Sequence, residues 1–76
     1  SILVYPNPAS NYITVKSEGE PIEEYLLYNI NGQLIDKGMV NFTDELTIPL
    51  TNVKAGVYFL HTRTNSELSV SRFVVE

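Results

Sequence analysis

The segment AGVYFLHTRTNSELSVSRFVVE, residues 55–76, has the pattern of a β-hairpin that ends at the last residues. Residues 57–60 are β-branched and aromatic or apolar, and residues 70–75 form a second such run. The Thr-Asn-Ser cluster at residues 64–66 supplies turn chemistry between the two runs. An apolar strand at a chain terminus needs either a sheet that holds it or a partner that binds it.

Outward from this hairpin, the chain repeats short strand patterns separated by turn residues. Residues 11–16 and 45–50 alternate apolar and polar side chains, as half-buried strands do, and Pro49 marks the second as an edge strand. Residues 2–5 stop at a Pro-Asn-Pro corner, which also predicts an edge strand. Residues 22–29 are apolar on both faces, which predicts a central strand. About seven short strands without a helical period predict an all-β, antiparallel β-sandwich.

Two glycines follow the expected central strand, each with a predicted role. Asn31-Gly32 lies between two apolar runs and predicts a type I′ hairpin turn, because that turn needs positive φ at both central residues. Gly38 interrupts the return strand, which we expect to reach Val40, and indicates a possible bulge.

Composition limits the classes of function. The 76 residues are enough for one domain, and the absence of cysteine excludes disulfides and thiolate chemistry. Five basic against nine acidic residues give a net charge of −4, which opposes binding to nucleic acid. No apolar run approaches the roughly 18 residues of a transmembrane helix, so we expect a soluble protein. The start at Ser1 without methionine suggests a fragment or processed piece of a longer protein.

No set of side chains indicates catalysis, a metal or a cofactor. His61 is the single histidine and accompanies no recognised nucleophile motif, so we interpret it as a strand residue on a sheet face or rim. Adjacent Glu23 and Glu24 are expected on opposite faces of their strand. The acidic residues match no calcium loop and are interpreted as solvated surface: Glu18, Glu20, Glu23, Glu24, Asp44 and Glu45.

Five tyrosines could form an aromatic platform for sugars. Tyr12, Tyr25, Tyr28 and Tyr58 lie inside predicted strands, however, so we expect them to pack in the core or on sheet faces, and Tyr5 is the least constrained. The sequence Asn-Phe-Thr at residues 41–43 fits the N-glycosylation pattern, which has meaning only in a suitable secretory host.

Three segments in this order resemble a known family: VYPNPASNYITV at residues 4–15, YNINGQLI at 28–35 and LTNVKAGVYFLHT at 50–62, followed by SRFVVE at the end. Together they resemble the C-terminal sorting domain of the type IX secretion system, or Por secretion tail. The resemblance implies an Ig-like β-sandwich, residues 1–76, at the end of a larger secreted protein. It implies a non-catalytic signal without cofactor or small-molecule substrate.

The resemblance also implies partners and a route in Gram-negative bacteria. The cargo, linked covalently upstream, would cross the inner membrane by a Sec signal and pass through the periplasm. The domain would then engage an outer-membrane translocon, and a surface sortase would remove it, leaving the cargo secreted or at the cell surface.

The family's terminal signal falls on six positions of the hairpin, and its other motifs on four positions earlier in the chain. The translocon-recognition residues implied by the resemblance are Gly56, Tyr58, Arg72, Phe73, Val74 and Val75. The implied structural motifs are Pro6, Asn7 and Pro8, with Gly32 as the hairpin glycine. Many members end in a basic tail, whereas this chain ends in Glu76, so Arg72 would supply the positive charge.

Three interpretations follow. The first is a sorting module whose last strand a translocon reads by β-augmentation, in which main-chain hydrogen bonds give affinity. The second is an Ig-like or fibronectin-like accessory module that binds carbohydrate or spaces domains, which a joint patch of Tyr5, Tyr12 or Tyr25 would favour. The third is an enzyme, which would need a cleft converging on His61. An exposed terminal strand could also pair two copies into a homodimer.

Overall fold

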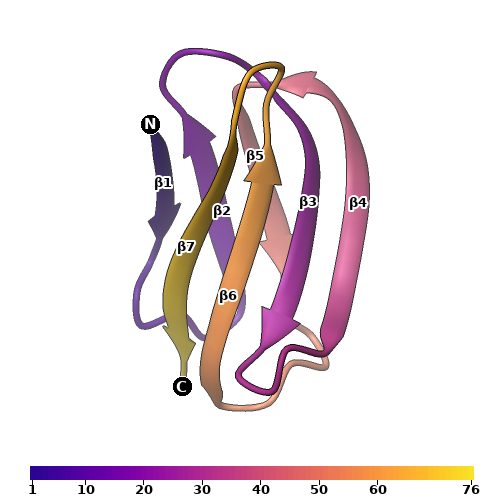
Figure 1. Cartoon of the computed structure of the whole chain (residues 1–76). Helices are drawn as coiled ribbons and strands as arrows, with labels where there is room; N and C mark the ends of the chain where they lie inside the picture. The colour runs from indigo at the N-terminus through magenta and orange to yellow at the C-terminus, as the bar shows by residue number, and fades with distance from the viewer.

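The computed structural model describes all 76 residues as seven strands in two antiparallel sheets that pack face to face, with no helix (Figure 1). One sheet has the order β1-β2-β5 and the other β4-β3-β6-β7. The prediction of an Ig-like antiparallel β-sandwich of about seven short strands is confirmed. The strands are β1 (Ile2–Tyr5), β2 (Tyr12–Ser17), β3 (Ile22–Asn29), β4 (Leu34–Thr43), β5 (Glu45–Pro49), β6 (Gly56–Arg63) and β7 (Leu68–Val75).

The core lies between the sheets and is built by side chains that alternate along each strand. Ile13 and Val15 of β2 are fully buried, as the period-two pattern predicts, and Tyr12 and Lys16 are exposed. The four-stranded sheet supplies the facing half of the core. The buried apolar residues are Ala9, Ile13, Val15, Ile22, Leu27, Ile48, Leu50, Tyr58, Leu60, Phe73 and Val75.

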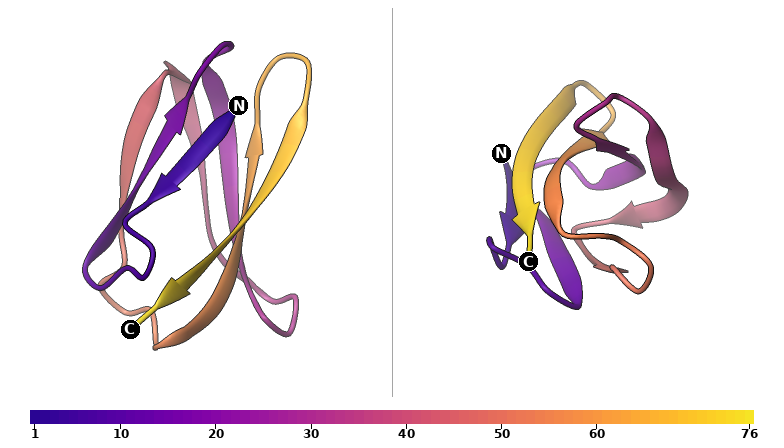
Figure 2. Two further views of the ribbon diagram at one scale, coloured as in Figure 1. Left: turned by 90° about the vertical axis from the view of Figure 1, so that its left-hand side faces the viewer. Right: turned by 90° about the horizontal axis from the view of Figure 1, so that it is seen from below.

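The predicted positions of the strands within the sheets are confirmed. β3 lies between β4 and β6, as predicted for a central strand. Its two faces are not both covered, however, because only Ile22 and Leu27 of β3 are buried and its other residues are half-buried. β1 and β5 each pair only with β2, so both are edge strands. Figure 2 shows β7 running diagonally along the side of the sandwich where it contacts β1. No helix is present that could cross a membrane.

The β3–β4 turn differs from the expected type I′ turn. Gly32 has a φ of 80°, but Asn31 does not have positive φ. The Gly32 N–H donates to the Asn29 carbonyl at 3.0 Å, and the Asn29 N–H donates to the Gln33 carbonyl at 3.0 Å. This is the pattern of a three-residue loop, in which a type I turn is followed by a left-handed glycine. The Asn29 side chain makes the difference, because its Oδ1 accepts from the N–H groups of Asn31 and Gln33.

Gly38 does not form the expected bulge. It pairs regularly with Tyr25, and the register shifts of the β3–β4 pair lie between Ile22 and Glu24 and between Leu27 and Tyr28. A Cβ atom at Gly38 would lie 2.6 Å from Cε2 of Tyr25, so the glycine leaves room for the tyrosine ring.

Candidate functional site

The C-terminal hairpin forms as predicted, from β6 and β7. The two strands pair without a register shift from Gly56 opposite Val75 to Arg63 opposite Leu68. Gly56 has a φ of 153°, a backbone conformation that favours glycine at the start of the hairpin. The hairpin is therefore a regular ladder that places the six predicted recognition residues on adjacent strands.

Three of those six residues point into the core. Phe73 is fully buried, and Tyr58 and Val75 are nearly so. The rings of Tyr58 and Phe73 stack with centroids 5.9 Å apart, and the Tyr58 hydroxyl donates to the Lys54 carbonyl at 2.6 Å. A partner cannot touch these side chains while the domain is folded, so they hold the hairpin against the other sheet.

The alternate residues of β7 point to the other face. Arg72 lies opposite Phe59 and is exposed, while Val74 lies opposite Val57 and is half-buried. We call this side of the four-stranded sheet, which faces away from the core, the outer face. The predicted signal residues are thus close in space but divided between the two faces of one sheet.

The Pro-Asn-Pro motif lies against the far end of the chain. Asn7 Oδ1 accepts a hydrogen bond from the Val74 N–H at 3.0 Å. Next to it, the Ala9 N–H donates to the Val74 carbonyl and the Glu76 N–H donates to the Ala9 carbonyl, both at 2.8 Å. The Asn7 side chain therefore bonds the backbone of a residue 67 positions later in the chain. We call this segment, residues 6–9, the strap; both of its X-Pro peptide bonds are cis.

The strap covers only one end of the outward side of β7. Because Val74 directs both its N–H and its C=O toward the strap, every second residue before it directs these groups to the same side. Those residues are Leu68, Val70 and Arg72, and β6 is the one strand that is hydrogen-bonded to β7 in the sheet, although β1 contacts β7. We call their outward main-chain groups the open edge.

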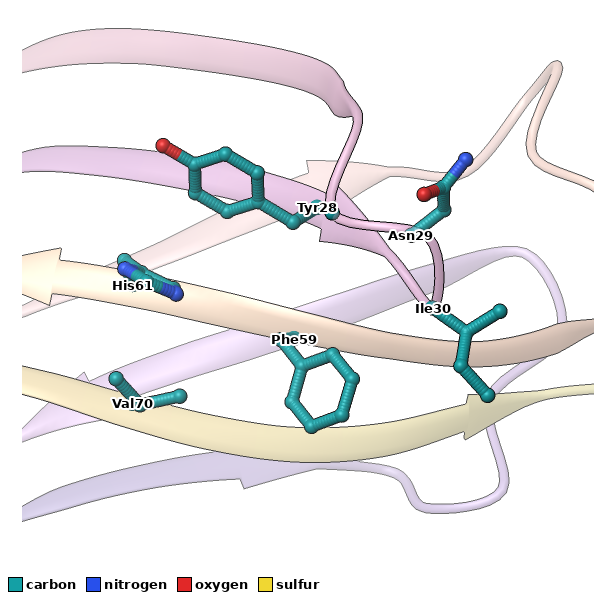
Figure 3. A pocket seen from close by; sticks show the side chains of 7 residues that line it. Tyr28, Asn29, Ile30, Phe59, His61 and Val70 are labelled. Atoms are coloured by element: carbon teal, nitrogen blue, oxygen red, sulfur yellow. The ribbon is translucent and has the colours of Figure 1, made fainter.

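The outer face beside the open edge is apolar and slightly hollowed. Tyr28, Phe59, His61 and Val70, with Ile30 at the end of β3, line a hollow of about 420 Å³ (Figure 3). The ring centroids of Tyr28 and His61 are 4.6 Å apart. His61 is therefore a residue of a sheet face, as predicted. Sequence reasoning missed Val70 and Phe59 as surface residues, because an apolar run does not show which face each side chain takes.

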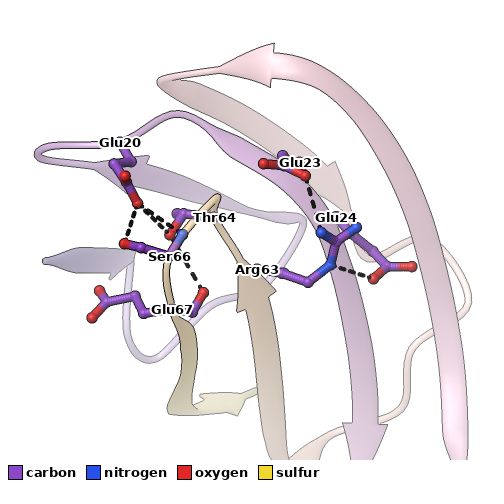
Figure 4. Close-up of polar contacts among 7 residues, drawn as sticks. All are labelled: Glu20, Glu23, Glu24, Arg63, Thr64, Ser66 and Glu67. Atoms are coloured by element: carbon purple, nitrogen blue, oxygen red, sulfur yellow. Dashed lines mark hydrogen bonds and ion pairs between the residues drawn. The ribbon is translucent and has the colours of Figure 1, made fainter.

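Arg63, at the end of β6, is held by two carboxylates (Figure 4). Its Nη1 lies 3.0 Å from Glu23 Oε1 and its Nε lies 3.2 Å from Glu24 Oε1. These hydrogen bonds, led by the one to Glu24, raise the pKa of Arg63. The two glutamates, which we expected on opposite faces of their strand, bind the same guanidinium next to the register shift between Ile22 and Glu24. Arg72 forms no ion pair with any carboxylate of the chain.

Glu20 ties the β6–β7 turn to the loop before β3 (Figure 4). Its Oε1 accepts hydrogen bonds from the Ser66 N–H at 3.0 Å, from the Ser66 hydroxyl, and from the Thr64 hydroxyl at 3.2 Å. These bonds, led by the one from the Ser66 hydroxyl, lower the pKa of the Glu20 carboxyl. The far end of the hairpin is thereby held by one ionised carboxylate.

The tyrosines do not form one platform. Tyr5 and Tyr12, in the three-stranded sheet, are 43% and 47% exposed, so the expectation that Tyr12 packs is wrong. Tyr25 lies in the other sheet and is half-buried, and its hydroxyl donates to Asp36 at 3.3 Å. Desolvation, with Asp36 nearby, raises the Tyr25 pKa. The structure has no group of three or more His, Cys, Asp or Glu side chains that could hold a metal ion.

A sandwich of one three-stranded and one four-stranded antiparallel sheet places the chain among Ig-like β domains. The family model for the secretion system C-terminal sorting domain, the Por secretion tail, matches residues 3–76. The chain therefore belongs to this family, whose members are sorting signals of the type IX secretion system carried by secreted or cell-surface proteins.

One solved structure with the same fold is that of PorZ from Porphyromonas gingivalis. PorZ is described as an essential bacterial surface component of the type IX secretion system of this human oral bacterium. The match has a TM-score of 0.81 at 20% sequence identity and covers 100% of this chain but 11% of the PorZ chain. This likeness shows the fold alone. A comparison with curated protein sequences gave no match.

Proposed function

We propose that residues 1–76 form the single C-terminal domain of a larger protein and act as a non-catalytic signal that directs this cargo through the type IX secretion system. The observation that carries the proposal is the family match over residues 3–76. In the proposed route, the cargo reaches the periplasm by Sec export, the domain engages the outer-membrane translocon, and a surface sortase removes the domain. The cargo is then released or stays at the cell surface.

The hairpin supports this proposal by offering a surface that main-chain hydrogen bonds can recognise. A translocon strand that pairs with the open edge would bind by β-augmentation. Within the proposed recognition set, Arg72 and Val74 are the side chains that a partner can contact on β7. Gly56, Tyr58, Phe73 and Val75 would contribute by shaping the hairpin. A homodimer through β7 is a second proposed use of the same edge.

The alternative function, an accessory module that binds carbohydrate, finds less support in the structure. Tyr5 and Tyr12 lie in one sheet and Tyr25 lies in the other, so the residues that would favour a sugar platform are separated.

A fusion experiment tests the sorting function. Residues 1–76 are attached to a Sec-targeted fluorescent protein in a bacterium that has this secretion system, and fluorescence is measured in the periplasm, on the surface and in the medium. We expect export in the wild-type strain and retention in a strain that lacks the translocon. A size change of the exported fusion would report sortase cleavage. Retention in both strains would contradict the proposal.

A further inference from the structure

We infer that the outer face of the four-stranded sheet is a docking surface for an acidic segment of another protein. An apolar side chain of that segment would enter the hollow, and carboxylates on either side of it would bind Lys37 and Arg72. This inference rests on the proposed function, since the partner is taken to belong to the secretion machinery. It concerns the side chains of a sheet face and not the main-chain groups of β7.

The register of the sheet places two rows of side chains across the hollow, because residues that pair directly lie on the same face. The first row consists of Tyr28, Phe59 and Arg72. The second row consists of Lys37, Leu26, His61 and Val70. Each row is aromatic or aliphatic except for one basic residue at its end, and the two basic residues lie at opposite sides of the sheet.

The apolar part of these rows is available to a partner, because no second sheet covers the outer face of this two-layer sandwich. The face of an antiparallel sheet that is turned away from the core is usually polar. Here Val70 is 57% exposed and lines the hollow together with Tyr28, Phe59 and His61 (Figure 3). The volume of about 420 Å³ is within the usual range of binding pockets, about 300–1,000 Å³. An exposed apolar area of this kind is typical of an interaction site.

The charges of the two rows are opposite in sign to the charge of the whole domain. Lys37 and Arg72 are exposed and form no ion pair with any carboxylate of the chain. Arg63, in the adjacent row, is already bound to Glu23 and Glu24. The domain has a net charge of −4, so the two rows form a basic area on an acidic protein. Charge complementarity therefore favours a partner that carries carboxylates.

The positions of the two cations set the spacing of the carboxylates in the partner. Lys37 lies on β4 and Arg72 lies on β7, the two outermost strands of the sheet. Three strand spacings of about 4.8 Å and a shift of two residues place their Cα atoms about 15 Å apart. About five residues of an extended segment span this distance, at about 3.4 Å per residue. The partner segment would therefore carry an apolar residue between two acidic residues.

Two other occupants fit this chemistry less well. A two-fold contact of the outer face with the same face of a second copy would bring Lys37 and Arg72 of both domains together without a carboxylate. An anionic lipid surface would attract these two cations but repel the domain as a whole, whose net charge is −4 with both cations included. The observations therefore favour an acidic segment of a different protein.

The first test compares Lys37→Glu with Lys54→Glu in the fluorescent fusion. Both variants change the net charge by the same amount, and Lys54 is exposed in the loop between β5 and β6, outside the two rows. We expect Lys37→Glu to lower export at least several-fold, because it puts a carboxylate where the partner's carboxylate would bind, and Lys54→Glu to stay near the wild type. Since Lys37 lies on β4, strand pairing at β7 would not explain such a loss.

A second pair of variants tests the apolar part of the surface. Val70→Glu places a charge beside the hollow, and Leu3→Glu makes the same kind of change at a residue that is 44% exposed on the three-stranded sheet. We expect Val70→Glu to lower export several-fold and Leu3→Glu to leave it near the wild type. Circular dichroism of the purified domains shows which variants fold, and if one variant is unfolded the other pair decides. Equal export within a folded pair would overturn the inference and leave the sorting function intact.

The unmodified fusion and the purified domain separate the remaining outcomes. Failure of the wild-type fusion to leave the periplasm contradicts the sorting function itself, not only the docking surface. Vesicles of phosphatidylglycerol test a lipid occupant, and sedimentation of residues 1–76 tests a second copy. Vesicle binding or a dimer that Lys37→Glu abolishes would overturn the inference of a protein partner.

Discussion

The two halves of β7 belong to one strand and one ladder, yet they have opposite environments. At the C-terminal half, Phe73 and Val75 are buried and the strap bonds the outward side of Val74. At the other half, Leu68 and Val70 are exposed, and their outward main-chain groups are hydrogen-bonded to no strand, although β1 contacts β7 on this side. A chain terminus is usually the first segment to fray. Here the last residues are the better anchored part.

The largest expected effect that separates the two halves is on stability. Phe73→Ala removes a fully buried ring that stacks on Tyr58, so it should lower the free energy of unfolding by about 3–5 kcal/mol. The total free energy of unfolding of a domain of this size is only about 5–10 kcal/mol. Val70→Ala should change the free energy of unfolding by less than about 0.5 kcal/mol. Urea unfolding of both variants measures this difference. Equal losses of unfolding free energy would contradict the view that only the C-terminal half of β7 is anchored in the core.

The strap should account for the next largest effect. Asn7→Ala removes the acceptor for the Val74 N–H and should cost about 1 kcal/mol of unfolding free energy. Hydrogen exchange should then accelerate at the Val74 amide, which would come to resemble the amides of Val70 and Arg72. Asn11→Ala is the control, because Asn11 is exposed and its side chain forms no hydrogen bond. Unchanged exchange at Val74 would show that the strap does not hold this edge.

A stabilising change is expected beside the exposed half of β7. Thr62 lies opposite Ser69 and is fully buried, and its Oγ1 has no hydrogen-bond partner. Thr62→Val replaces the hydroxyl by a methyl group of similar size and should raise the free energy of unfolding by about 1 kcal/mol. Thr64→Val should lower it instead, since the Thr64 hydroxyl bonds Glu20. A loss of stability in Thr62→Val, measured in urea, would contradict this.

The smallest effect is a pH dependence at the β6–β7 turn. Hydrogen bonds from Ser66 lower the pKa of Glu20 below its ordinary value of 4.5 in the folded state. The resulting stabilisation is present above the unfolded pKa and is lost as the pH falls through the lowered folded pKa. Hydrogen exchange at the Ser66 amide should therefore accelerate only below about pH 4.5. In Glu20→Gln the acceleration of exchange at low pH should disappear. If it persists, a group other than Glu20 is responsible for it.

The candidate site could be predicted from the sequence only in part. The hairpin of residues 55–76 and its turn follow from local composition, and the proposed recognition residues near the terminus follow from the family resemblance. The faces taken by residues 72–75 do not, because a run of apolar residues carries no alternation that distinguishes core from surface. No local pattern predicts the open edge, which exists because the strap bonds only the end of β7 and no further strand is hydrogen-bonded there.

Local patterns were enough to predict the strands, most of their boundaries and the all-β class, because side-chain alternation and turn residues act over a few neighbouring positions. The tertiary structure alone decided which distant groups meet. Asn7 reaches Val74 across 67 residues, and Arg63 reaches Glu23 across 40. Such contacts depend on how two sheets pack and on register shifts within them, and no local pattern encodes either. The division of β7 into an anchored end and an open edge is therefore a property of the folded domain.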